Sequence, residues 1–131
     1  VLAHECVSGD FSGADPTSTL RKLARIARRV LREGGNPGAL FLGSSLALPG
    51  LFSADTLTIA PNLGWRNIPR EELLHPLHDL AVTLVANEAD LAAYAVAYPR
   101  PGVPEGPDSF IYVSGEVVRV VRAVAWKLSR D

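Results

Sequence analysis

The pattern of apolar and polar residues predicts one clear amphipathic helix near the start of the chain. Asp15 is suited to an N-cap, and Pro16 occupies the first helical position, where its missing N–H costs nothing. The Gly-Gly-Asn-Pro run at 34–37 supplies the stop. Between these signals, apolar residues recur at steps of three and four, and they are Leu20, Leu23, Ala27, Val30 and Leu31.

Short apolar runs bounded by turn residues predict strands along the rest of the chain. The runs are residues 2–7, 40–48, 56–60, 82–86, 109–113 and 117–128, of which 40–48 and 82–86 are expected to be buried. Short helices are expected from 69–74 and from 87–98, with loops at 61–67 and 99–107. Strands that alternate with helices predict an α/β fold in which at least part of the sheet is parallel.

Composition places the chain among folded proteins. Its 131 residues match one domain, and 47% hydrophobic residues with a mean hydropathy of +0.14 exclude a disordered chain. A net charge of −1 gives no overall attraction to nucleic acid, and the single cysteine, Cys6, cannot form an internal disulfide. With neither a run of about 20 apolar residues nor a signal-peptide pattern, we expect a cytoplasmic protein. The lack of methionine suggests a piece of a longer one.

The polar face of the first helix is strongly basic. It carries Arg21, Lys22, Arg25, Arg28, Arg29 and Arg32. Such a face is compatible with nucleic-acid or phosphate binding, and equally with a solvated surface whose cations favour the C-terminal end of the helix dipole. No aromatic residue interleaves the basic ones, as a single-strand binder would need, and this favours the solvated surface.

Asn87-Glu88-Ala89-Asp90, at a predicted junction of strand and helix, is the best candidate site. Ligands of α/β sheets gather beyond the carboxyl ends of strands. There an Asn amide can donate and accept hydrogen bonds, and a Glu carboxylate can accept from hydroxyls or act as a base. The alternative is that Asn87 caps the helix while the acids complement its dipole, and spacing alone favours this alternative.

His75 and His78 stand three residues apart beside Asp79, as metal ligands can. Pro76 interrupts the short helix between them, and a third ligand would have to come from His4 or Cys6. We therefore expect no metal site. The sequence also has no Ser/His/Asp arrangement, phosphate-binding Walker loop or dinucleotide fingerprint.

Four segments resemble, in order and spacing, motifs of the ROK family (repressor, open reading frame, kinase). They read LALPG at 46–50, TLTIAPNLGWRNIP at 56–69, VTLVANEADLAA at 82–93 and SFIYVSGEV at 109–117. The ANEADLAA form is similar to that of the actinobacterial ROK transcriptional regulators. The resemblance covers nearly the whole chain.

The resemblance implies an actin-like, ribonuclease-H-like ATPase fold, in which two α/β lobes close over a sugar and ATP. Residues 1–131 would then form a single N-terminal-lobe domain, a partial lobe with a mixed sheet and flanking helices. It also implies that Asn87 and Glu88 contact sugar hydroxyls and that Asn62 belongs to the segment lining the sugar side of the cleft.

Departures from the family pattern argue against catalysis. Glu88 stands where the kinases have the aspartate that deprotonates the sugar hydroxyl, and a misplacement of about 1 Å can cost about 10²-fold in rate. The family's Asp-x-Gly-Gly-Thr phosphate loop, winged helix and second lobe are absent from the sequence, and VVRVVRA at 117–123 replaces a glycine-rich turn.

We therefore expect a non-catalytic fragment of a sugar-responsive transcriptional regulator that binds sugar weakly, without a cofactor. Neither nucleic acid nor a membrane is an expected partner of this segment. One alternative is a ROK sugar kinase that phosphorylates hexoses with ATP. Another is a degenerate remnant without independent function, whose valine-rich strand edge at 117–128 would favour self-association.

Overall fold

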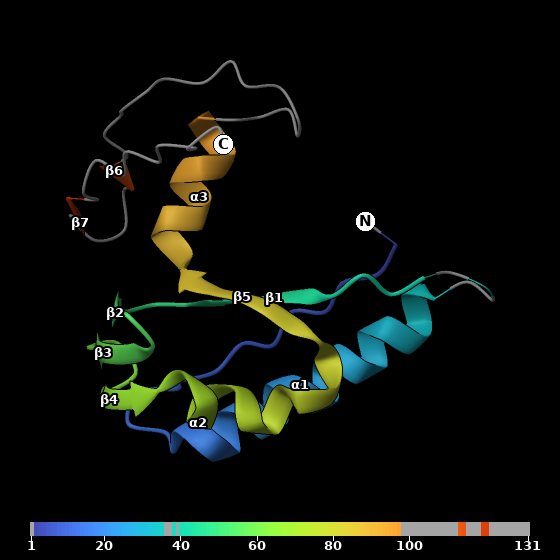
Figure 1. Cartoon of the computed structure of the whole chain (residues 1–131), viewed down its shortest axis with the longest axis horizontal. Helices are drawn as coiled ribbons and strands as arrows, with labels where there is room; N and C mark the ends of the chain where they lie inside the picture. Colours follow the sequence, from blue (N-terminus) through green and yellow to red (C-terminus); the bar gives the residue numbers. More distant parts are fainter. Residues whose placement is uncertain (1, 36–37, 39, 98–112, 115–118, 121–131) are drawn as a thin grey trace. The chain divides into compact units, whose positions relative to one another are not determined.

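The computed structural model describes residues 2–35, 38, 40–97, 113–114 and 119–120. The described residues form helices and short strands in a mixed α/β arrangement, which confirms the α/β class of the prediction (Figure 1). The chain divides into two compact units, Val1–Ala86 and Asn87–Asp131.

Helix α1, Pro16–Gly34, begins and ends close to the predicted positions. The side chain of Asp15 caps it by accepting a hydrogen bond from the Ser18 N–H at 2.8 Å. Leu20 and Ala24 are buried, whereas Leu23 and Leu31, which were expected on the apolar face, are exposed. The helix packs mainly against two short helices, Arg70–Leu74 and His75–Leu80, and its buried surface is narrower than the apolar stripe.

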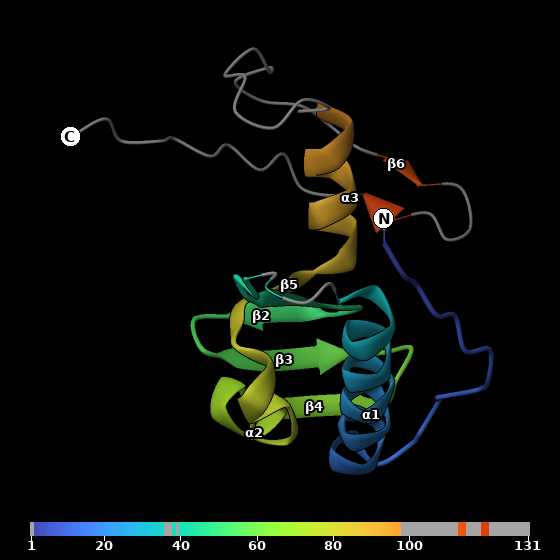
Figure 2. The same ribbon diagram turned by 90° about the vertical axis from the view of Figure 1, so that its right-hand side faces the viewer.

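The first unit contains a three-stranded antiparallel sheet in the order β2-β3-β4 (Figure 2). Its strands are β2, Leu51–Ser53, β3, Thr56–Ala60, and β4, Trp65–Pro69. Strand β3 was predicted, but β4 begins inside the segment expected to be a loop. Trp65 and Ile68 are buried and pair with Ala60 and Leu57 of β3, respectively, so pairing and burial override the local turn signals.

Strands β1, Ser44–Leu48, and β5, Val82–Asn87, pair in a separate two-stranded sheet. The expected buried strand at 40–48 is wrong at its start, because pairing begins only at Ser44, whose N–H donates to the Ala81 carbonyl at 3.1 Å. Leu40 and Leu42 are consequently 82% and 86% exposed.

Strand β5 forms where it was predicted but is not fully buried. Thr83 and Leu84 are exposed and the rest of β5 is half-buried, because within the described part of the chain β5 pairs with β1 alone. The predicted strand at 2–7 is also wrong. That segment forms no strand, and its Glu5 side chain pairs instead with Arg29 of α1.

Two short helices connect β4 to β5. They are α2, Arg70–Leu74, which confirms the helix predicted there, and the 3₁₀ helix η1, His75–Leu80. Leu73 of α2 and Leu77 and Leu80 of η1 are buried. They join a core built from α1, β1, β3 and β4, to which the main contributors are Leu20, Ala24, Leu46, Leu48, Leu57, Ala60, Trp65 and Ile68.

The second unit begins with α3, Glu88–Ala97, in agreement with the predicted helix. Strands β6, Val113–Ser114, and β7, Arg119–Val120, pair antiparallel, Val113 with Val120 and Ser114 with Arg119. The expected loop at 99–107 lies outside the described residues, as does the rest of the expected strands 109–113 and 117–128, including the edge considered for self-association.

Candidate functional site

Asn87 lies where β5 ends and α3 begins, as the sequence predicted. Its side-chain Oδ1 accepts hydrogen bonds from the backbone N–H groups of Ala89, at 2.7 Å, and Asp90, at 3.3 Å. These are the contacts of a helix cap, which confirms the capping interpretation of this residue. The Asn87 side chain is half-buried and held in one orientation at the junction.

Glu88 is the first residue of α3 and is exposed. Together with Asp90 it places two carboxylates in the first turn, where negative charge is favourable next to the unpaired N–H groups of a helix. A carboxylate at this position can accept hydrogen bonds from the hydroxyl groups of a ligand.

Asn62 is exposed in the turn between β3 and β4. Hydrogen bonds from Leu63 N–H to the Ala60 carbonyl, at 3.0 Å, and from Gly64 N–H to the Pro61 carbonyl, at 3.2 Å, close this turn. Gly64 has a φ of +70°, a conformation that glycine adopts without strain. Asn62 belongs to the first unit, whereas Asn87 and Glu88 belong to the second, so the predicted residues are divided between the units.

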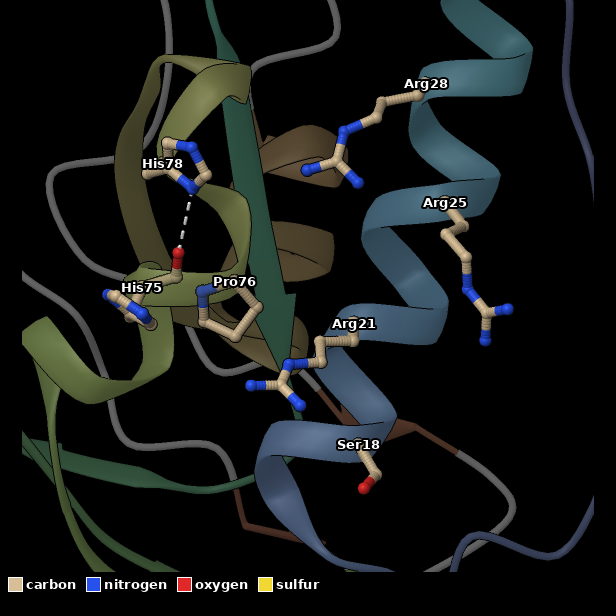
Figure 3. A pocket seen from close by; sticks show the side chains of 7 residues that line it. All are labelled: Ser18, Arg21, Arg25, Arg28, His75, Pro76 and His78. Carbon is tan, nitrogen blue, oxygen red and sulfur yellow. Dashed lines mark hydrogen bonds between the residues drawn. The ribbon is translucent and has the colours of Figure 1, made fainter.

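A pocket of about 540 Å³ lies between α1 and η1, within the first unit (Figure 3). Its lining comprises Ser18, Arg21, Arg25, Arg28, His75, Pro76 and His78. The guanidinium group of Arg21 points towards Pro76 and His75, and that of Arg28 points towards η1, whereas that of Arg25 turns away from η1. The pocket is thus lined by cationic and imidazole groups contributed by two elements.

Arg28 is held at this pocket by Asp79 of η1. Its Nε and Nη2 each donate a hydrogen bond of 2.7 Å to the Asp79 carboxylate. The two side chains thus form a bidentate salt bridge between α1 and η1. These hydrogen bonds lower the pKa of Asp79 to about 2 and raise the pKa of Arg28. The pair therefore fixes a charged guanidinium beside the pocket.

The η1 side of the pocket is also ordered by local contacts. The Nδ1 of His78 lies 3.1 Å from the carbonyl of His75, and since a carbonyl only accepts, Nδ1–H is the donor. The two imidazole rings lie 6.5 Å apart between their centres. Within the described residues, no group of three His, Cys, Asp or Glu side chains could hold a metal ion.

The basic face of α1 is partly neutralised. Arg29 forms a bidentate salt bridge with Glu5. The hydrogen bonds from the Arg29 guanidinium lower the pKa of the Glu5 carboxyl. Lys22 lies 5.3 Å from the centre of the Phe11 ring, in a cation–π contact. The basic face is therefore divided between internal contacts and the pocket.

Sequence analysis singled out the arginines and histidines of this pocket, but it did not predict that they lie close together. The arginines were recognised as a helix face and the histidines as a spaced pair, but Arg28 and Asp79 are 51 positions apart. The signal in the sequence that could have indicated the packing of α1 against η1 is the apolar face of each helix. These faces contain the buried residues Leu20, Leu77 and Leu80.

Among the described residues, none of the helices combines the length and apolar character needed to cross a membrane. No family model matches the chain, and no curated protein or solved structure matches it significantly.

Proposed function

We propose that the chain is a non-catalytic, sugar-binding lobe of the ROK type, derived from a sugar-responsive transcriptional regulator. The observation that carries the proposal is the junction at Asn87 and Glu88. The segment that resembles the family's sugar-contacting motif coincides with the point where β5 ends and α3 begins. In this proposal the mixed α/β arrangement is part of an actin-like ATPase lobe.

In this proposal Asn87 and Glu88 have different roles at the junction. Because Oδ1 of Asn87 accepts from the Ala89 and Asp90 N–H groups, Asn87 fixes the start of α3 and presents its amide at a defined position. The Glu88 carboxylate is exposed beside it and accepts hydrogen bonds from sugar hydroxyls. Asn62, exposed on its turn in the first unit, is the third residue that the proposal assigns to sugar recognition.

Glu88 is also the reason to propose binding without catalysis. In the resembled kinases an aspartate at this position takes the proton of the attacking sugar hydroxyl. Glutamate moves the carboxylate by one methylene group, and a displacement of about 1 Å can reduce a rate about 10²-fold. Glu88 is therefore proposed as a hydrogen-bond acceptor for the sugar.

Calorimetric titration of the full chain with glucose, N-acetylglucosamine and xylose tests this function. We expect at least one sugar to bind with a Kd on the order of 1 mM or weaker, since an exposed junction encloses little of a ligand. Glu88→Gln should weaken that binding about tenfold, because the carboxylate is a stronger acceptor than an amide.

Asp90→Asn is the matched control, because it removes a carboxylate from the same helical turn. The absence of binding heat with every sugar, or equal weakening by both substitutions, would overturn the proposal. Hexose-dependent consumption of ATP by the chain would instead support the kinase alternative.

A further inference from the structure

We propose that the pocket between α1 and η1 binds a phosphate group, either free phosphate or the phosphate monoester of a small molecule. The lining of this pocket includes no residue of the junction at Asn87 and Glu88. It is formed entirely within the first unit, so the inference does not depend on the proposed sugar-binding function.

The lining of the pocket suits an anionic ligand, and its volume accommodates a small molecule. At about 540 Å³ it lies in the range of small-molecule sites, which is about 300–1,000 Å³. Arg21 points towards His75 and Pro76, and Ser18 adds a hydroxyl group to the lining (Figure 3). Guanidinium, imidazole and hydroxyl groups are all donors that phosphate oxygens accept from.

Arg28 is pre-oriented for this role. Its bonds to Asp79 use Nε and Nη2, which leaves the two hydrogens of Nη1 for a further acceptor. A guanidinium already held in place loses less side-chain freedom when a ligand binds, so its hydrogen bond contributes more to affinity. Asp79 offsets one positive charge of the cluster, while Arg21 and Arg25 make no ion pair among the described residues.

Asp79 is an acidic residue beside the pocket, and its carboxylate is paired with Arg28. Within the described part of the chain, the lining of the phosphate pocket includes no Asp or Glu. Glu71 and Glu72 line a neighbouring pocket of about 350 Å³ that shares only His75 and Pro76 with it. The carboxylates of Glu71 and Glu72 therefore line a different pocket from the arginines.

The distribution of charge favours a small anion over duplex nucleic acid. Arg29 is bound to Glu5 and Arg28 to Asp79, so the basic residues do not form an unbroken strip along α1. The chain as a whole has a net charge of −1, whereas affinity for the DNA backbone depends on many unpaired cations. Arg21, which lines the pocket and makes no ion pair among the described residues, points towards His75 and Pro76.

The test is an NMR titration of the full chain with sodium phosphate and with glucose 6-phosphate, at constant pH and at ionic strength matched by sodium chloride. We expect saturable shifts of the His75 and His78 ring signals with both ligands. Tighter binding of glucose 6-phosphate would assign the site to phosphate esters, and equal binding would assign it to free phosphate.

Arg21→Ala should weaken phosphate binding about tenfold, as expected for the loss of one charge-assisted hydrogen bond. Arg32→Ala is the control, because it removes an exposed arginine of the same helix that does not line the pocket. It should change the affinity less than twofold. Arg21→Lys should give an intermediate loss, since lysine keeps the charge but not the planar fork.

Three results would overturn the proposal. They are the absence of saturable shifts, equal losses for Arg21→Ala and Arg32→Ala, and binding of duplex DNA that competes with phosphate and declines with salt with the steep slope of multiple phosphate contacts. Circular dichroism of each variant separates a loss of binding from a loss of fold.

Discussion

At the scale of single residues, the ion pair between Arg28 and Asp79 links the stability of α1 and η1 to pH. The hydrogen bonds from Arg28 lower the pKa of Asp79 from 3.8 to about 2. A carboxyl whose pKa is lower in the folded state stabilises that state above its unfolded pKa and loses this contribution as the pH falls through its folded pKa. Both side chains are partly exposed, so the contribution is small.

Asp79→Asn should therefore destabilise the chain at pH 5 and above, and the difference from the parent protein should shrink as the pH falls from about 4 to about 2. Urea unfolding at a series of pH values measures this. Asp55→Asn, at an exposed turn between β2 and β3, serves as the control. A difference between parent and Asp79→Asn that stays constant down to pH 2 would contradict the assignment.

Gly50 is a second residue whose identity is dictated by its surroundings. It is buried at the end of the turn from β1 to β2, and a Cβ there would lie 2.7 Å from Leu57 Cδ1 and 2.8 Å from the Ile59 carbonyl oxygen. A side chain can move, but the backbone of a paired strand moves only with difficulty.

Gly50→Ala should lower the free energy of unfolding by about 1–3 kcal/mol, the usual cost of overpacking a core. Gly9→Ala is the matched control, because a Cβ there would make only ordinary contacts, at 3.5 Å, with the Phe11 ring. Chemical denaturation of both variants measures the difference, and equal stability would show that the backbone around Gly50 yields readily.

At the scale of elements, burial differs between neighbouring strands of the three-stranded sheet. Leu57 of β3 is fully buried, whereas Leu51 of β2, on the neighbouring strand, is 65% exposed. Leu57→Ala should cost about 2–5 kcal/mol of stability, because it removes buried methyl groups and leaves a cavity. Leu51→Ala should cost less than about 0.5 kcal/mol. Similar losses in the two variants would contradict the exposure of Leu51.

The predictability of the elements depended on how local their signals are. α1 was predicted because its cap, its proline and its stop signal all lie within the helix or beside it. β4 was missed because its strand character comes from the pairing of Trp65 and Ile68 with β3. The strands expected at 2–7 and 40–43 were wrong for the converse reason, since an apolar run becomes a strand only where a partner strand is present.

At the scale of the whole molecule, the α/β class followed from the alternation of strands and helices, and the junction at Asn87 followed from the end of one element and the start of the next. The phosphate pocket could not be predicted from such local patterns, because it depends on the packing of α1 against η1. The four strands β1 to β4 and helix α2 lie in the sequence between α1, which contains Arg21, and His75. Local patterns therefore identified its residues without showing that they meet.

The most direct test of the proposed sugar-binding function is an amide correlation NMR spectrum of the full 131-residue chain during titration with glucose, N-acetylglucosamine and xylose. The account predicts saturable shifts concentrated at residues 87–90 with at least one sugar, strongly reduced in Glu88→Gln and retained in Asp90→Asn. Spectra in which none of the sugars shifts these amides, or in which Glu88→Gln responds as the parent does, would contradict it.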